Sequence, residues 1–167
     1  MTKKWVWGVL VAVVGVAVFV TNVLATPPSG FTPSQQWKGV FGEIDLLVVN
    51  KEPKEPGHRV KLKTQGESDL YVTRNTIAPG GQSGWHTHPG PSLIIVTAGE
   101  ITAYAGDDPT CTPTRYRTGQ GFIDPGDGHV HLLRNETLEP AETVAVQIVP
   151  KDATRRIDTP AQGNCSF

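Results

Sequence analysis

The chain has 167 residues, with 15 lysines and arginines against 16 aspartates and glutamates, and a formal charge of −1 at pH 7. This length favours a single folded domain. Without a basic excess there is no electrostatic footprint for DNA or RNA, so we expect no nucleic-acid partner.

Residues 1–25 carry an export pattern. Lys3 and Lys4 precede an uncharged run from Trp5 to Val20, and small residues follow up to Ala25. This pattern predicts a signal peptide cleaved after Ala25, or an uncleaved anchor helix, since a spanning helix needs about 20 apolar residues. In both cases we expect an extracytoplasmic protein, secreted or membrane-anchored through residues 5–25, with no other membrane contact. Removing residues 1–25 takes away two lysines and no acid, which leaves a formal charge of −3.

The rest of the chain is predicted to be all-β. Residues 26–36, "TPPSGFTPSQQ", contain three prolines and few apolar residues, so we predict a Pro-rich linker there. From residue 37 to 150, short runs of β-branched and apolar residues alternate with turn residues, which is typical of a β-sandwich or barrel. The predicted strands are Phe41–Val49, Arg59–Lys63, Leu70–Ala78, Ser92–Ala98, Glu100–Tyr104, Arg115–Arg117, Gly121–Ile123, Val130–Arg134 and Thr143–Val149.

The two cysteines, Cys111 and Cys165, predict a disulfide bond in an exported protein. It would tether the C-terminal tail, residues 151–167, to a loop in the middle of the chain. The alternative is two free thiols.

Four of the five histidines form two H-x-H pairs, His86/His88 and His129/His131. Alternate residues of a strand point to the same face, so each pair shares a face where the backbone is extended. Imidazole is a common ligand of transition metals. The pairs therefore suggest a metal site. Solvent-facing histidines are the alternative, above all for His129, which follows a turn.

The first pair lies in a motif that resembles the cupin superfamily. That motif is a glycine, five residues, H-x-H, three or four residues, glutamate, six residues and glycine. Gly80, His86, His88 and Gly99 match it, and Ser92 stands where the family has glutamate.

The second cupin motif is also present. Gly119, Pro125, Gly128, His131 and Asn135 match it, with one extra residue between Pro125 and Gly128. The resemblance implies a single cupin-type jelly-roll β-barrel, preceded by the N-terminal signal or anchor helix, with edges managed by two facing sheets. It also implies that His86, His88 and His131 are metal ligands in the barrel, and that a homodimer can form.

Ser92 is the departure from the family pattern. A carboxylate supplies a hard, negative oxygen, whereas a neutral hydroxyl is a poor ligand. Three alternatives stay open: a three-histidine site with free positions, recruitment of His129 as a fourth ligand, or weakened metal binding. The metal would be a divalent Fe, Mn, Cu, Ni or Zn ion.

Two functions remain open at this stage. An open coordination position suggests a metal-dependent oxygenase or isomerase that acts on a small molecule. The alternative is a non-catalytic cupin that binds a small ligand or a metal at the cell surface. Asp124 and Asp127 are interpreted as turn residues and Tyr104 as a hydrogen-bonded structural tyrosine. No general base is evident.

Overall fold

The computed structural model describes residues 24–50 and 57–167, and all of its regular elements are strands. The signal or anchor prediction for residues 1–25 falls almost wholly outside these residues. No helix in the described part of the chain has the length and hydrophobicity needed to cross a membrane. The strands are β1 Ser29–Phe41, β2 Asp45–Val49, β3 Arg59–Lys63, β4 Ser68–Gln82, β5 His86–Thr87, β6 Ser92–Ala98, β7 Glu100–Ala105, β8 Thr114–Arg117, β9 Gly121–Asp124, β10 His131–Arg134, β11 Ala141–Pro150 and β12 Ile157–Asp158.

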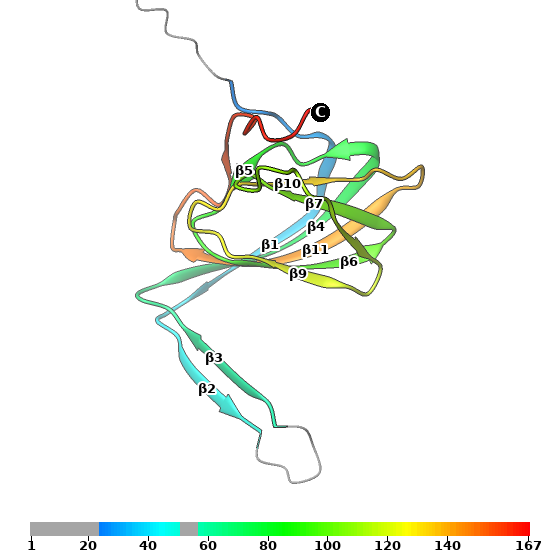
Figure 1. The fold of residues 1–167 in the computed structure, drawn as a ribbon. Helices are drawn as coiled ribbons and strands as arrows, with labels where there is room; N and C mark the ends of the chain where they lie inside the picture. Colours follow the sequence, from blue (N-terminus) through cyan, green and yellow to red (C-terminus); the bar gives the residue numbers. More distant parts are fainter. Residues whose placement is uncertain (1–23, 51–56) are drawn as a thin grey trace, which may run out of the picture.

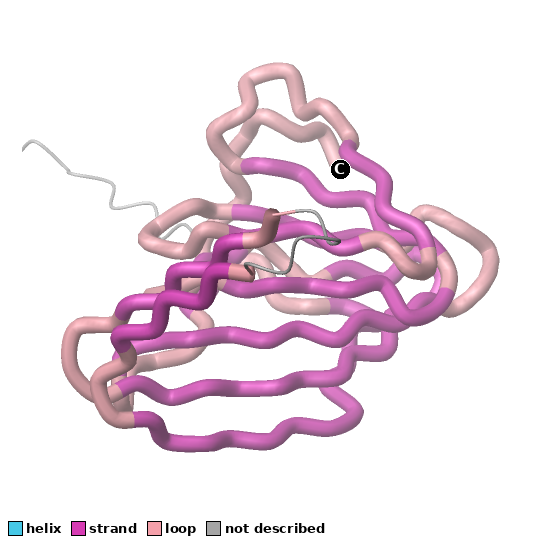
Figure 2. Tube along the Cα trace, turned by 90° about the horizontal axis from the view of Figure 1, so that it is seen from below, coloured by secondary structure: helices cyan, strands magenta, loops and turns pink. Residues whose placement is uncertain are grey.

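The strands form a nearly closed antiparallel barrel with two facing layers (Figures 1 and 2). One layer has the order β1-β4-β11-β6-β9, and the other consists of β12, β5, β10, β7 and β8. The long strand β4 joins the layers, because its far end also pairs with β10 through Gln82 and Arg134. The all-β jelly-roll prediction is confirmed for the described residues.

The predicted linker over residues 26–36 is corrected by strand β1. From Ser29 onward these residues pair with β4, so the barrel starts before residue 37. Proline cannot donate to a ladder and is tolerated on edge strands or at bulges. Among the described strands, β1 pairs only with β4, and its register shifts between Pro33 and Gln35. Prolines and polar residues are typical of a linker, which is why the sequence predicted one. A bulged edge strand tolerates the same residues.

The predicted strand Phe41–Val49 is split in two. Strand β1 ends at Phe41, and β2 starts at Asp45 and pairs only with β3. The β2–β3 hairpin extends away from the barrel (Figure 1), so the predicted barrel span of residues 37–150 contains a separate two-stranded sheet.

Buried and more exposed side chains alternate along β6 and β11, and the buried ones line the barrel interior. In β6, Ile94 and Val96 are buried, whereas Leu93 and Ile95 are about half exposed. In β11 the buried positions include Thr143 and Gln147, so the barrel interior is polar at one end. At the other end Ile77, Val96, Ile101, Leu133 and Ala141 form an apolar core.

The tail after β11 returns across the second layer. Strand β12 pairs with β5, and a disulfide joins Cys111 to Cys165. The disulfide prediction is confirmed. The tail is therefore fixed at two points, one of them on the strand that carries His86.

Candidate metal centre

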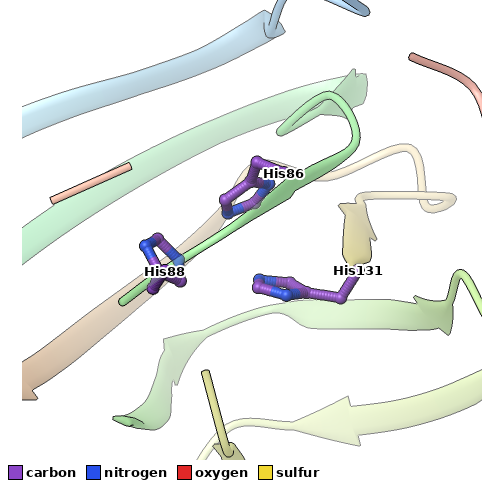
Figure 3. A group of neighbouring side chains, drawn as sticks. All are labelled: His86, His88 and His131. Carbon is purple, nitrogen blue, oxygen red and sulfur yellow. The ribbon is translucent and has the colours of Figure 1, made fainter. Parts of the chain in front are cut away.

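His86, His88 and His131 meet inside the barrel (Figure 3). His86 lies in β5, His88 directly follows it, and His131 opens β10, where it is the registered partner of His86. The parity of an extended strand turns His86 and His88 to the same side. All three rings are buried, with 7% or less of each residue exposed.

The three rings converge closely. One ring nitrogen of each lies within 4.8 Å of the others, compared with the roughly 4 Å that we expected from metal–nitrogen bonds of about 2.0–2.1 Å. The centroid of His86 is 4.3 Å from that of His131 and 4.9 Å from that of His88. The three nitrogens therefore converge on one point of the barrel interior and would have to move closer together to share one ion.

Backbone carbonyls fix the orientation of the rings. Nδ1 of His86 donates to the Gly84 carbonyl at 2.8 Å, and Nδ1 of His88 donates to the Arg155 carbonyl at 2.7 Å. Nδ1 of His131 lies 3.4 Å from the His129 carbonyl. A carbonyl can only accept, so Nε2 keeps the free lone pair in the neutral rings. Histidine ligands in metalloproteins are commonly held in this way.

Burial keeps these imidazoles neutral. It is the main cause that lowers the pKa of His86 far below its usual range, with the nearby His131 as the next contribution. Burial also lowers the pKa of His88, and it lowers that of His131 to about 4 against the opposing attraction of Asp124. Neutral imidazole is the form that binds metals, so the site is competent for binding at neutral pH.

Asp124 brings a buried carboxylate close to two of the three histidines. It is the registered partner of Ser92 across the β6–β9 ladder, and only 3% of it is exposed. Its Oδ2 lies 3.9 Å from Nε2 of His88 and has no hydrogen-bond partner. Its Oδ1 lies 3.5 Å from Nδ1 of His131. We had interpreted Asp124 as a turn residue. It does accept the Gly126 backbone N–H, but its place in the histidine cluster was missed.

Ser92 itself does not replace the carboxylate. Its hydroxyl accepts a hydrogen bond from Nε2 of Gln147 at 2.8 Å and faces the barrel interior.

His129 lies on the other side of His131 and does not join His86 and His88. Its Nδ1 is 3.3 Å from Oδ1 of Asp124, and its ring stacks on that of His131 with centroids 6.0 Å apart. Asp124, His129 and His131 form a second group whose ligand atoms lie within 4.8 Å of one another. His129 therefore contacts the candidate centre through Asp124.

A cavity of about 140 Å³ adjoins the three histidines, and its lining combines polar residues with apolar ones such as Phe31, Ile94 and Leu133. Its wall includes Thr73 and Asn75 from β4, Thr143 and Gln147 from β11, and Arg155 from the tail. Sequence reasoning missed these five residues. The strand parity of β11 would have placed Thr143 and Gln147 on one face, but nothing local to Arg155 indicates that the tail reaches this wall.

Trp85 and Tyr104 lie in a second apolar cluster, with Leu132, beside the disulfide. The Tyr104 hydroxyl donates to Oε1 of Glu136 at 2.7 Å, and burial raises the pKa of Tyr104 to about 12. The interpretation of Tyr104 as a hydrogen-bonded structural tyrosine agrees with this contact.

Gly84 is predicted to be irreplaceable in the turn that leads to His86. Its φ is +70°, and a Cβ added there would come within 2.2 Å of the Thr26 carbonyl oxygen. Gly119 has φ +86° but no atom within 4 Å of an added Cβ. A left-handed backbone alone costs a side chain about 1–2 kcal/mol. In urea unfolding we expect Gly84→Ala to lower the free energy of unfolding by at least about 2 kcal/mol more than Gly119→Ala. Equal losses would show that the turn relaxes around the methyl group.

The donor set fits a divalent transition metal. The site offers three neutral imidazoles with oriented lone pairs and one buried carboxylate oxygen without a partner. Imidazole with a carboxylate suits Fe, Mn, Ni and Zn.

Comparison with known proteins gives the family. Residues 73–147 match the family model described as "Cupin domain". No curated protein matches the chain.

Among solved structures, one is a conserved protein with a double-stranded β-helix domain from Klebsiella pneumoniae. It aligns at 24% identity over 71% of this chain and 84% of that one, with a TM-score of 0.46. A cupin 2 conserved barrel domain protein from Salinispora arenicola aligns at 23% identity over 47% of this chain and 61% of that one, with a TM-score of 0.41. An oxalate oxidase aligns at 25% identity over 49% of this chain and 46% of that one, with a TM-score of 0.42. The matched residues include both histidine motifs, and residues 73–147 are therefore a domain of the cupin superfamily.

Proposed function

We propose that this chain is an exported cupin that holds a divalent transition metal through His86, His88 and His131 and binds a small molecule in the adjoining cavity. The observation that carries this proposal is the convergence of three buried, neutral imidazoles whose Nδ1 atoms all face backbone carbonyls. Asp124 would complete the site as a ligand, or would hold His131 in place.

The activity we favour is that of a metal-dependent oxygenase or isomerase. A bound metal would supply Lewis-acid polarisation of an oxygen atom on the small molecule. The protein's own contribution is to orient the ligands, to surround the bound molecule with the polar residues of β4 and β11, and to limit the access of water.

Non-catalytic ligand or metal binding is the second candidate, and the cavity wall favours it in one respect. Among the described residues, the wall includes histidines and arginines but no aspartate, glutamate, lysine, tyrosine or cysteine. No general base other than a histidine therefore faces a bound molecule.

Metal content tests the proposal. The hydrogen-bonded fold begins at Thr26, so residues 26–167 can be purified without a histidine tag and incubated with each of Fe, Mn, Cu, Ni and Zn. We expect about one ion per chain, and loss of that ion in both His86→Ala and His131→Ala. The exposed His58 provides the matched control, because His58→Ala should keep the ion. An absence of metal from the unmodified protein, or its retention in both site variants, would reject the metal centre.

Export rests on the N-terminal pattern and on the disulfide, because disulfides persist in oxidising compartments. Cell fractionation tests it. Recovery of the full-length chain in the cytoplasm with reduced cysteines would contradict export. The homodimer stays a prediction.

A further inference from the structure

The polar end of the barrel cavity holds an arginine without an acidic partner. Arg155 is half-buried in the wall, and among the described residues no carboxylate lies within ion-pair distance of it. Its Nη1 donates to Oε1 of Gln147 at 2.6 Å, and its guanidinium lies 5.8 Å from the centre of the Tyr71 ring. The neighbouring Arg156 is different, because its Nε donates to Asp158 at 2.6 Å.

The buried part of the Arg155 guanidinium faces a neutral acceptor in place of an acid. Guanidinium stays protonated in proteins, and removing it from water is costly unless an opposite charge or several acceptors replace the solvent. Gln147 provides one neutral acceptor and leaves most of the five N–H donors of Arg155 for a ligand. Among the described residues, the cavity wall includes Arg155 and Arg156 and no carboxylate, so this wall carries positive charge.

A second polar group on the wall is also unpartnered. Thr73 is 1% exposed, and its hydroxyl Oγ1 has no hydrogen-bond partner. Buried hydroxyls are normally satisfied, so Oγ1 of Thr73 is available to bond to a molecule in the cavity. Thr73 and Gln147 line the same cavity as Arg155, and both offer neutral polar groups in addition to its charge.

The backbone of Arg155 ties this residue to the metal centre. Its carbonyl accepts the Nδ1 proton of His88 at 2.7 Å, so the residue that bears the charge also orients a metal ligand. The side chains of Arg155 and His88 also line the same cavity, so one molecule in that cavity can face both. The cavity volume of 140 Å³ corresponds to about five water molecules, at about 30 Å³ each.

We propose that Arg155, with Gln147 and Thr73, forms an anion subsite that takes the carboxylate of a small organic acid and presents it beside the candidate metal centre. This inference rests on the proposed function, whose substrate class it specifies. The planar fork of arginine matches a carboxylate with two parallel hydrogen bonds.

Calorimetric binding of acetate and malonate tests the subsite, with acetamide and malonamide as neutral counterparts of the same shape. Each probe is titrated into metal-free and metal-treated protein, and metal content is measured separately. We expect the acids to bind and the amides to bind at least about tenfold more weakly. Arg155→Gln should weaken acid binding by at least about tenfold while metal content stays unchanged, because the backbone carbonyl that holds His88 remains. Arg155→Lys should keep part of the acid binding that Arg155→Gln loses. Arg115 is exposed, and Arg115→Gln should leave acid binding unchanged.

The outcomes separate the two proposals. Acid binding that depends on Arg155 in a protein that takes up no metal supports the subsite and rejects the metal centre. Metal uptake with acid binding that is equal in wild type and Arg155→Gln rejects the subsite alone. The subsite is also rejected if the amides bind as tightly as the acids, or if neither acid binds.

Discussion

Replacing Asp124 with asparagine is expected to weaken metal binding by about tenfold to 100-fold. This is the range found when a group that orients a metal ligand is lost. A larger loss would indicate that the carboxylate is itself a ligand. Asparagine keeps the size of the side chain and the oxygen that can accept the Gly126 N–H, but it removes the negative charge next to His88 and His131. Competition with a chelator of known affinity measures the change.

Asp127 provides the control for this substitution. It lies three positions away, is exposed, and has φ +51°, a conformation that asparagine adopts readily. Asp127→Asn should therefore retain the metal affinity of the parent protein. If Asp124→Asn behaves in the same way, with an intact circular dichroism spectrum, the carboxylate has no part in the site and the three histidines act alone.

Removing the disulfide is expected to cost about 4 kcal/mol of the free energy of unfolding. The bridge closes a sequence separation of 54 residues, and on the chain-entropy model a loop of that length gives this value. Urea unfolding of the double variant Cys111→Ser with Cys165→Ser, compared with the oxidised protein, measures the loss.

The same variant should also bind metal more weakly, because the tail carries the Arg155 carbonyl that holds His88. The effect should be smaller than that of Asp124→Asn. The β12–β5 pairing and the hydrogen bonds from Asn164 to the Ala105 and Asp108 carbonyls still hold the tail. A reducing agent should lower the stability of the parent protein and leave the double variant unchanged. If the parent protein is equally stable with and without reductant, the bridge does not contribute.

The fold was largely predictable because its signals are local. Strand parity and the turn residues gave the all-β class and most strands, and the cupin motifs gave the three histidines. The positive φ angles of Gly80, Gly99, Gly119 and Gly128 explain why those motif positions are glycine. Buried Asn135 donates to the Ile77 and Glu139 carbonyls, which accounts for the last position of the second motif.

The missed parts depend on contacts between distant residues. Strand β1 is stabilised by its long pairing with β4, and its own composition is typical of a loop. Asp124 reaches the histidines only in the register that places it opposite Ser92. Arg155 lies 67 residues from His88 in sequence, and no periodicity connects them. Only the folded barrel brings these groups together.

The pairing of Ser92 with Asp124 implies that a site of this kind can lose the glutamate of the first motif and still keep a negative charge. In an antiparallel ladder two facing residues point to the same side, so one acidic group can be supplied from either strand. A genome survey that requires the glutamate at the first position would discard this chain as lacking an anionic donor. A survey that also inspects the residue opposite would count one acid, and would group the chain with its glutamate-bearing relatives.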